Sequence, residues 1–301
     1  MSLNKPIFKL YDWINKDYLK SFGLSKNINA IDFLKEHPDK IDWFYLSGNP
    51  NAIELLENNI DKIYWNIFSS NKNANKILKE NRDKINWTGL SLNHNQDNFN
   101  LLLENPYKIN WYYISENPYS IELIKNNKNW NYWMYLSKNT NPEAIKILRK
   151  NTDLIIWEHL SANPCLEAIK LLEENPDKID WMYLSGNPNA IKILEKNQDK
   201  IDWVQLSKNP NAMKLIEENP DKINWYYLSI NPNAIKILEK NQDKIDWYFL
   251  SMNTGIFEQL DYEKMRINNE DMYEELIKEV MKPSRVFKNP DYDYLEELFG
   301  D

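Results

Sequence analysis

A serine followed two positions later by an asparagine recurs eleven times, from residues 25–27 to residues 251–253. A serine hydroxyl becomes a nucleophile when a general base, usually a histidine, lies beside it. The three histidines, His37, His94 and His159, fall in different repeats and at different positions of the repeat. Eleven evenly spaced copies therefore do not form one catalytic site. We expect the serines and asparagines to be structural, bonding to helix ends and turns in a ladder along the molecule.

The other reactive residue types are equally dispersed. No spacing of histidine, cysteine or carboxylate side chains matches a metal site, and the six glycines form no phosphate-binding loop. Cys165 is the single cysteine and has no adjacent charged residue to activate its thiol. We therefore expect no enzymatic activity, no cofactor and no bound metal ion.

The net charge of −8 is unevenly distributed along the chain. Residues 254–301 carry 13 acidic and 6 basic side chains, which leaves residues 1–253 nearly neutral. Binding of nucleic acid by release of counterions requires a basic surface, so this distribution disfavours nucleic acid as a partner. The single cysteine suits a reducing compartment, and no stretch approaches the ~20 apolar residues of a membrane helix. We expect a cytoplasmic protein that does not bind membranes.

A tryptophan marks each repeat, and successive markers lie 22 or 24 residues apart. An earlier repeat, "SFGLSKNINAIDFLKEHPDKI", has Ser21 at the marker position. The tryptophan markers are Trp43, Trp65, Trp87, Trp111, Trp133, Trp157, Trp181, Trp203, Trp225 and Trp247.

Each repeat reads as two short helices. In residues 187–197, Asn187 fits an N-cap, Pro188 the first helical position, and Asn197 a left-handed residue after the helix. An Asp or Asn usually precedes the tryptophan, as at Asp180, and predicts a second N-cap. Ile179 is expected just before that helix, as a plug between repeats. The extra two residues of the 24-residue repeats follow the recurrent asparagine, so we expect them to lie in a loop.

Two short helices cannot bury their own apolar faces, so neighbouring repeats must stack. The sequence predicts an all-α fold, an α-solenoid of about ten two-helix repeats of 22–24 residues. With ~8–10 Å between packed helices, we expect a rod or arc about 90 Å long. The predicted divisions are an N-terminal capping segment (1–20), the repeat domain (21–253) and an acidic C-terminal helical cap (254–301).

We interpret the tryptophans as core side chains that hold neighbouring repeats together, and not as surfaces on which nucleobases stack. Each shares a helix face with an apolar residue three positions later, and burying an indole of ~200 Å² contributes about 5 kcal/mol gross per repeat. The same structural role is predicted for the recurrent asparagines and serines. In the three most regular repeats these are Asn187, Asn209, Asn231, Ser185, Ser207 and Ser229.

The positions one and two residues after the marker point away from the tryptophan face and vary between repeats. They are rich in aromatic residues, which are enriched at protein interfaces. They are therefore a candidate partner-binding face, with packing against the neighbouring repeat or the terminal segment as the alternative. The aromatic members are Tyr45, Tyr113, Tyr135, Tyr183, Tyr227 and Phe249 at the second position, and Tyr112, Tyr226 and Tyr248 at the first.

The repeat wording "KIDWxxLSxNPNAIxILEKN" is followed by a closing segment that includes residues 281–286, "MKPSRV". Together they resemble the 22-residue-repeat proteins of nucleocytoplasmic large DNA viruses, the giant viruses of amoebae and algae. The resemblance covers residues 21–290, although such proteins often carry histidine where this chain has Lys282. It implies a viral product in the host cytoplasm or in the virus particle, and it transfers no catalytic residues.

Three functions follow as expectations. The leading one is a non-catalytic scaffold that binds a host or viral protein through the aromatic face. The second is a structural or assembly component of a virus particle. The third is a solenoid that reads single-stranded RNA one base per repeat, which the charge distribution disfavours.

Overall fold

The computed structural model describes residues 7–127 and 132–260. Each marker residue, the tryptophan or Ser21, begins a helix of about one turn, which we call an inner helix. As predicted, the preceding Asp or Asn caps it: the Asp180 carboxylate accepts from the Tyr183 N–H at 3.0 Å. The inner helices of the described residues are α1 (Ser21–Lys26), α3 (Trp43–Ser47), α5 (Trp65–Phe68), α7 (Trp87–Ser91), α9 (Trp111–Ile114), α11 (Trp133–Leu136), α13 (Trp157–Ala162), α15 (Trp181–Ser185), α17 (Trp203–Ser207), α19 (Trp225–Leu228) and α21 (Trp247–Leu250).

The second helix of each repeat is amphipathic and is called an outer helix. In the repeat that begins at Trp181 it buries Ile193 and Leu194 and exposes Glu195 and Lys196. The outer helices of the described residues are α2 (Ile31–Glu36), α4 (Ile53–Glu57), α6 (Asn75–Glu80), α8 (Gln96–Leu103), α10 (Ile121–Asn126), α12 (Pro142–Arg149), α14 (Leu166–Glu173), α16 (Ile191–Lys196), α18 (Met213–Glu218) and α20 (Ile235–Lys240).

A 3₁₀ turn follows most outer helices, an element that the sequence pattern did not predict. Its sequence is "PDK" or "QDK" in the regular repeats, and the isoleucine after it is extended and in most repeats buried, as expected for Ile179. The turns are η1 (Pro38–Lys40), η2 (Ile60–Lys62), η3 (Arg82–Lys84), η4 (Pro106–Lys108), η6 (Thr152–Leu154), η7 (Pro176–Lys178), η8 (Gln198–Lys200), η9 (Pro220–Lys222) and η10 (Gln242–Lys244); η5 (Pro118–Ser120) and η11 (Thr254–Ile256) lie elsewhere in their repeats.

Two predicted helix boundaries are wrong. The outer helix α16 begins at Ile191 and not beside Asn187, because the Asn187 side-chain oxygen accepts from the Asn189 N–H and closes a turn that precedes the helix. Asn197 is not left-handed: its φ is −134°, and its amide donates to the Ile193 carbonyl four residues earlier. In both cases the asparagine side chain makes a different local hydrogen bond from the one that the pattern favoured.

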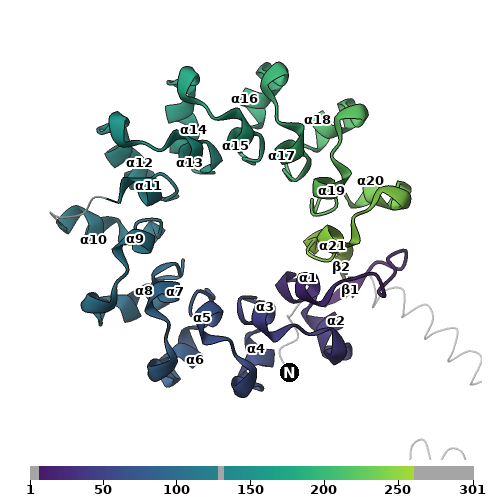
Figure 1. Cartoon of the computed structure of the whole chain (residues 1–301), viewed down its shortest axis with the longest axis horizontal. Helices are drawn as coiled ribbons and strands as arrows, with labels where there is room; N and C mark the ends of the chain where they lie inside the picture. Colours follow the sequence, from purple (N-terminus) through teal and green to yellow (C-terminus); the bar gives the residue numbers. More distant parts are fainter. Residues whose placement is uncertain (1–6, 128–131, 261–301) are drawn as a thin grey trace, which may run out of the picture. The chain divides into compact units, whose positions relative to one another are not determined.

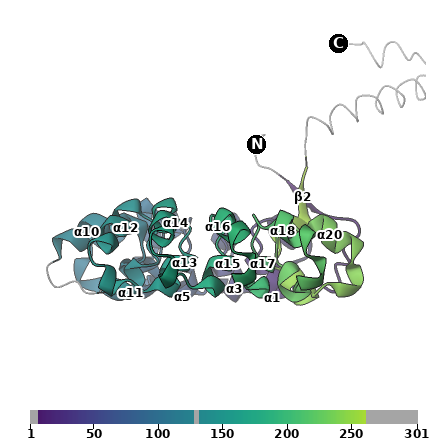
Figure 2. The same ribbon diagram turned by 90° about the horizontal axis from the view of Figure 1, so that it is seen from above.

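Residues 10–258 form a closed ring, which corrects the expected rod or arc. The contacts divide the chain into this ring unit and a second unit, residues 1–9 with 259–301. Figure 1 shows the inner helices on the inside of the ring and the outer helices around them. Seen edge-on, the outer helices α14, α16, α18 and α20 lie toward one side of the ring, and the inner helices α13, α15 and α17 lie toward the other (Figure 2). Helix α1 packs against α21, so the first and last repeats are neighbours.

The recurrent asparagines form the predicted ladder, and the ladder is circular. The Asn209 amide donates to the Ser185 and Asn187 carbonyls of the preceding repeat, each at 3.0 Å. The same bond joins each of the eleven asparagines to the one before it, and the Asn27 amide closes the circle by donating to the Asn253 carbonyl at 2.8 Å. All eleven side chains are buried.

The serines join the same repeats a second time. The Ser185 hydroxyl donates to the Trp181 carbonyl at 2.7 Å and accepts from the Asp202 N–H of the next repeat at 3.0 Å. The hydroxyl therefore satisfies the end of one helix and the start of the next. The corresponding bond at the closure runs from the Lys20 N–H to the Ser251 hydroxyl, at 2.8 Å.

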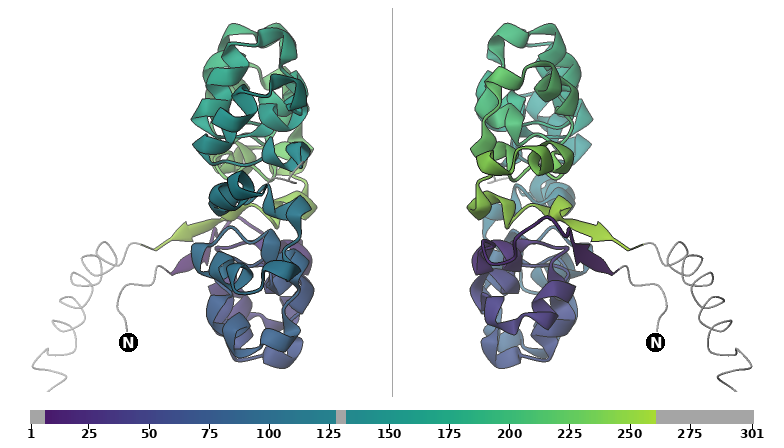
Figure 3. Two further views of the ribbon diagram at one scale, coloured as in Figure 1. Left: turned by 90° about the vertical axis from the view of Figure 1, so that its left-hand side faces the viewer. Right: turned by 90° about the vertical axis from the view of Figure 1, so that its right-hand side faces the viewer.

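The eleventh repeat is assembled from both ends of the ring unit. Its inner helix α21 comes from the C-terminal end, whereas residues 15–20 take the place of a 3₁₀ turn. Tyr18 occupies the position of the usual lysine, and Leu19 that of the buried isoleucine. No outer helix is present there among the described residues; instead β1 (Phe8–Leu10) pairs with β2 (Phe257–Gln259), as Figure 3 shows. Of the C-terminal cap predicted for 254–301, residues 261–301 lie outside the described residues.

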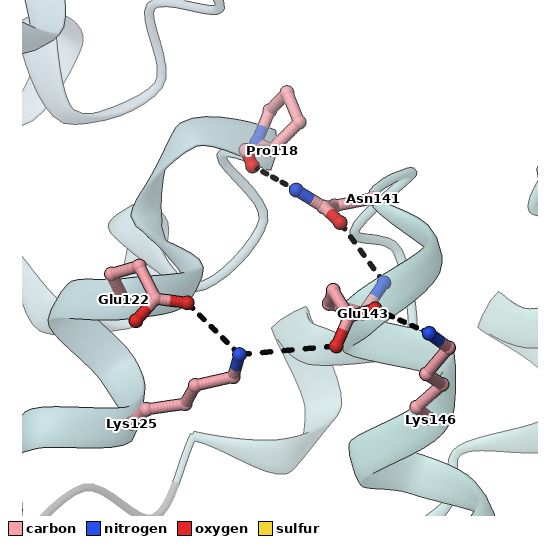
Figure 4. A network of polar contacts seen from close by, with 6 residues as sticks. All are labelled: Pro118, Glu122, Lys125, Asn141, Glu143 and Lys146. Carbon is pink, nitrogen blue, oxygen red and sulfur yellow. Dashed lines mark hydrogen bonds and ion pairs between the residues drawn. The ribbon is translucent and has the colours of Figure 1, made fainter.

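The 24-residue repeats keep the ladder, but their extra residues lengthen the outer helix to eight residues and not the loop before it, which corrects the expected position of the insertions. Asn141 caps α12 by accepting from the Glu143 N–H at 2.9 Å, and its amide donates to the Pro118 carbonyl at 2.7 Å (Figure 4). Lys125 lies between Glu122 and Glu143, which links α10 to α12. The hydrogen bond from Lys146 is the main cause that lowers the pKa of Glu143. These exposed ion pairs contribute little to stability.

The tryptophans are half-buried and do not belong to the fully buried core, which corrects the interpretation of their position. The core consists of residues such as Leu184 and Leu194, between the two rows of helices. In six repeats a lysine from the next 3₁₀ turn covers the indole, for example Lys222 over Trp203 with Nζ 4.8 Å from the ring centre. The indole still joins adjacent repeats, but through a cation–π contact at the surface.

Replacing Lys222 by glutamine is expected to lower the free energy of unfolding by about 0.5–1 kcal/mol, because it removes this cation–π contact. Urea unfolding followed by tryptophan fluorescence measures the change. Lys178→Gln is the matched control: it has the same position in its repeat, but its Nζ lies 3.4 Å from an Asp177 carboxylate oxygen. Equal losses in the two variants would contradict the assigned role of the contact.

Candidate partner-binding surface

The inner helices position the aromatic residues that the sequence pattern singled out. In α3, Leu46 and Ser47 are buried toward the outer helices, so Phe44 and Tyr45 lie on the opposite side of the helix. We call this side of all the inner helices the inner face. Its residues are the first and second after each marker, and the residue between the recurrent serine and asparagine.

The first position is more exposed than the second, although the sequence pattern predicted that both point away from the tryptophan face. Tyr248 is 50% exposed, whereas Phe249 is half-buried. The reason is that an aromatic ring at the first position packs against the ring at the second position of the next repeat and covers it. Tyr226 packs in this way against Phe249, with 4.0 Å between ring centres. Tyr183 is the exception at the second position, at 43% exposure.

Ring closure gathers one large group of aromatic side chains, which we call the seam arc. Phe22 lies 4.2 Å from Tyr248 and 5.8 Å from Tyr45 between ring centres, although more than 200 residues separate it from Tyr248 in sequence. The arc therefore continues across the junction of the first and last repeats. Its members are Phe22, Phe44, Tyr45, Tyr226, Tyr227, Tyr248 and Phe249.

A second, smaller arc lies on α9 and α11. The ring centres of Tyr112 and Tyr135 are 3.9 Å apart, and Tyr113 and Tyr132 contact the same pair. The hydrogen bond with Tyr112, followed by burial, raises the pKa of the Tyr135 hydroxyl to about 12. The Tyr135 hydroxyl therefore stays neutral at physiological pH, and the arc offers rings and hydroxyl groups.

The rest of the inner face is less aromatic. Positions one and two are Asn66 and Ile67 on α5, and Glu158 and His159 on α13. The predicted aromatic residues are thus not one continuous band: the structure brings most of them together in two arcs and places Tyr183 outside both. Charges are few, whereas the ion pairs between repeats lie along the outer helices, as between Lys35 and Glu54.

Comparison with known proteins identifies no relative of this chain. No family model, curated protein or solved structure matches the chain. Within residues 7–127 and 132–260 no helix has the length and apolarity needed to cross a membrane. The same residues contain no group of three or more histidine, cysteine or carboxylate side chains placed to hold a metal ion.

Sequence reasoning missed Phe22 as a surface residue. It occupies the first position of the repeat whose marker is Ser21, whereas the candidate residues were taken from the repeats that have a tryptophan marker. The serine–asparagine pair at Ser25 and Asn27 was the signal that could have included it. Its neighbour Tyr248 could not have been found in this way, because only closure of the ring brings the two rings together.

Proposed function

We propose that this chain is a non-catalytic scaffold that binds a short polypeptide segment on its inner face. The observation that carries the proposal is the pair of aromatic arcs, whose exposed members stand on a frame held by buried, reciprocal hydrogen bonds. Tyr112, Tyr226 and Tyr248 are 38%, 47% and 50% exposed. Rigid aromatic side chains bury a large area on binding at a low cost in conformational entropy.

The charges of the inner face support a polypeptide over a nucleic acid. Between the recurrent serine and asparagine, Lys26, Lys138 and Lys208 are partly balanced by Glu116, and Glu158 adds a second acid. All three of these lysines lie over tyrosine rings, with Nζ 4.5 Å from the ring centre for Lys26, 5.0 Å for Lys138 and 5.9 Å for Lys208. A basic stripe able to release counterions is not formed by these residues. We further propose a viral origin and a location in the host cytoplasm or in the virus particle. The resemblance of the repeat sequence to proteins of large DNA viruses supports this part of the proposal.

The test uses peptides selected from a random phage-displayed library on the immobilised protein. Binding of the fluorescein-labelled selected peptide is measured by anisotropy for wild type and for Tyr248→Ser and Tyr112→Ser. We expect one of these variants to bind about 10- to 30-fold more weakly, as for loss of an aromatic hot spot. Tyr107→Ser is the control, because Tyr107 is 81% exposed in η4, off the inner face.

Unchanged affinity in both inner-face variants, with folding intact, would remove the inner face as the binding surface. A labelled oligouridine is titrated in parallel at about 150 mM salt, where surface electrostatics are screened over ~8 Å. We expect no binding. Saturable binding of oligouridine that is lost in Tyr248→Ser would favour the RNA-binding alternative over the scaffold.

A further inference from the structure

A pocket opens on the inner face beside the seam arc, at the second repeat. Its volume is about 310 Å³, at the small end of the range for ligand sites. Its lining residues are Lys26, Phe44, Tyr45, Gly48, Asn49 and Ile67. The side-chain polar groups of Asn49 are already engaged in the ladder, where its amide donates to the Ser25 and Asn27 carbonyls. The pocket therefore offers apolar walls and one cation.

The residue between serine and asparagine lines the pocket. In the second repeat this residue is Gly48, and its only close side-chain neighbour is Ile67, whose Cγ2 would lie 3.0 Å from an added Cβ. Gly186 has the same position in the eighth repeat, but there Lys208 and Gln205 of the next repeat lie over it, 3.5 and 3.6 Å from an added Cβ. The second repeat thus places an isoleucine methyl group beside its glycine, whereas the eighth places a lysine and a glutamine there.

The cation at the rim is Lys26. Its Nζ lies 4.5 Å from the centre of the Tyr45 ring, and no ion pair joins it to a described carboxylate. Its charge is therefore balanced by the face of an aromatic ring, which a carboxylate entering from solvent can supplement. A ligand whose apolar group contacts Phe44 and Ile67 could bring a carboxylate to the Lys26 ammonium if a few bonds separate its apolar group from its carboxylate.

We infer that this pocket is the anchor subsite of the scaffold, and that it takes an aromatic or leucine side chain of the partner with an adjacent carboxylate directed to Lys26. The inference rests on the proposed function, since it names the part of the partner that the inner face recognises. Apolar burial supplies the affinity, and the ion pair at the rim selects acidic neighbours.

The test uses 3-phenylpropanoate as the probe, a phenyl ring and a carboxylate on one short chain, with 3-phenylpropanamide as its uncharged counterpart. The full chain is labelled with ¹³C at isoleucine methyl groups, and the Ile67 signal is assigned with Ile67→Val. We expect 3-phenylpropanoate to shift the Ile67 signal with a millimolar Kd. We expect the amide to bind about two- to fivefold more weakly, the range for one exposed ion pair.

Two variants with repeat-matched controls identify the site. Gly48→Leu fills the pocket and is expected to abolish the Ile67 shift, whereas Gly186→Leu leaves it unchanged. Lys26→Gln, a surface change that keeps the pocket, is expected to weaken 3-phenylpropanoate to the level of the amide, whereas Lys208→Gln does not. Equal binding of acid and amide, or an unchanged titration in Gly48→Leu, would overturn the inference. Neither outcome touches the peptide test, which uses residues outside the pocket.

Discussion

Replacing Asn187 by alanine is expected to lower the free energy of unfolding by about 2–5 kcal/mol, one of the two largest effects of a single substitution in this protein. The Asn187 amide donates to the Ser161 and Asn163 carbonyls at 2.9 Å, and its side-chain oxygen accepts from the Asn189 N–H. The side chain is 1% exposed, so water cannot replace it. Each buried carbonyl left without a donor costs about 1–3 kcal/mol.

The measurement is urea unfolding at equilibrium, followed by far-ultraviolet circular dichroism. The control is Asn189→Ala, two residues away, whose amide donates to the Pro164 carbonyl at an exposed site. Water can replace that bond, so we expect a loss below about 1 kcal/mol. Comparable losses in the two variants would show that the buried ladder is not what holds the repeats together.

Replacing Gly23 by valine is expected to open the ring at the junction of α1 and α21. A Cβ on Gly23 would lie 2.4 Å from the Ser251 Cβ and 3.0 Å from its carbonyl carbon, so the two helices must separate. Separation breaks the bonds from the Lys20 N–H to Ser251 and from the Asn27 amide to Asn253. Overpacking of this kind costs about 1–3 kcal/mol. We expect a larger radius of gyration by small-angle X-ray scattering.

Two other glycines in the same kind of helix or at its end serve as controls. Gly89→Val creates a similar overlap, 2.8 Å from the Asn66 carbonyl oxygen, but between α5 and α7, where the chain is continuous. It should destabilise the protein and leave the ring closed. Gly186→Val meets no atom within 3.4 Å of the new Cβ and should change stability by less than about 0.5 kcal/mol. If the scattering curve of Gly23→Val were identical to that of wild type, the prediction that contacts between α1 and α21 keep the ring closed would be contradicted.

The closure also changes the contact that the last marker indole makes. The repeat at Ser21 has no tryptophan, and the indole of Trp247 meets Tyr18 at 5.0 Å where other repeats place a lysine. A ring has no free end that must be capped with a polar surface, as an open solenoid does. The N-terminal residues 15–20 instead complete the repeat that begins at Trp247, which joins the two ends of the ring unit.

The sequence by itself determined the repeat, its two helices and much of its capping. Asp180 caps α15, Asn141 restarts α12 after an insertion, and Ile179 is buried before its helix, all as predicted. These features depend on residues within a few positions of one another, and local hydrogen bonds and apolar periodicity record them directly. The predictions for Asn187 and Asn197 were wrong because an asparagine side chain has several local partners, and the choice depends on the neighbouring repeat.

Only the tertiary structure decided that the solenoid closes, that the marker indoles are half-buried with lysines over six of them, and that most of the aromatic residues gather in two arcs. Closure depends on the small rotation between adjacent repeats, accumulated over eleven of them, and no single repeat encodes that sum. Once the rotation brings α1 against α21, Phe22 meets Tyr248 and Asn27 bonds to Asn253. Contacts between residues more than 220 positions apart leave no periodic trace in the chain, and the contact of Phe22 with Tyr248 that joins the two ends of the seam arc is of this kind.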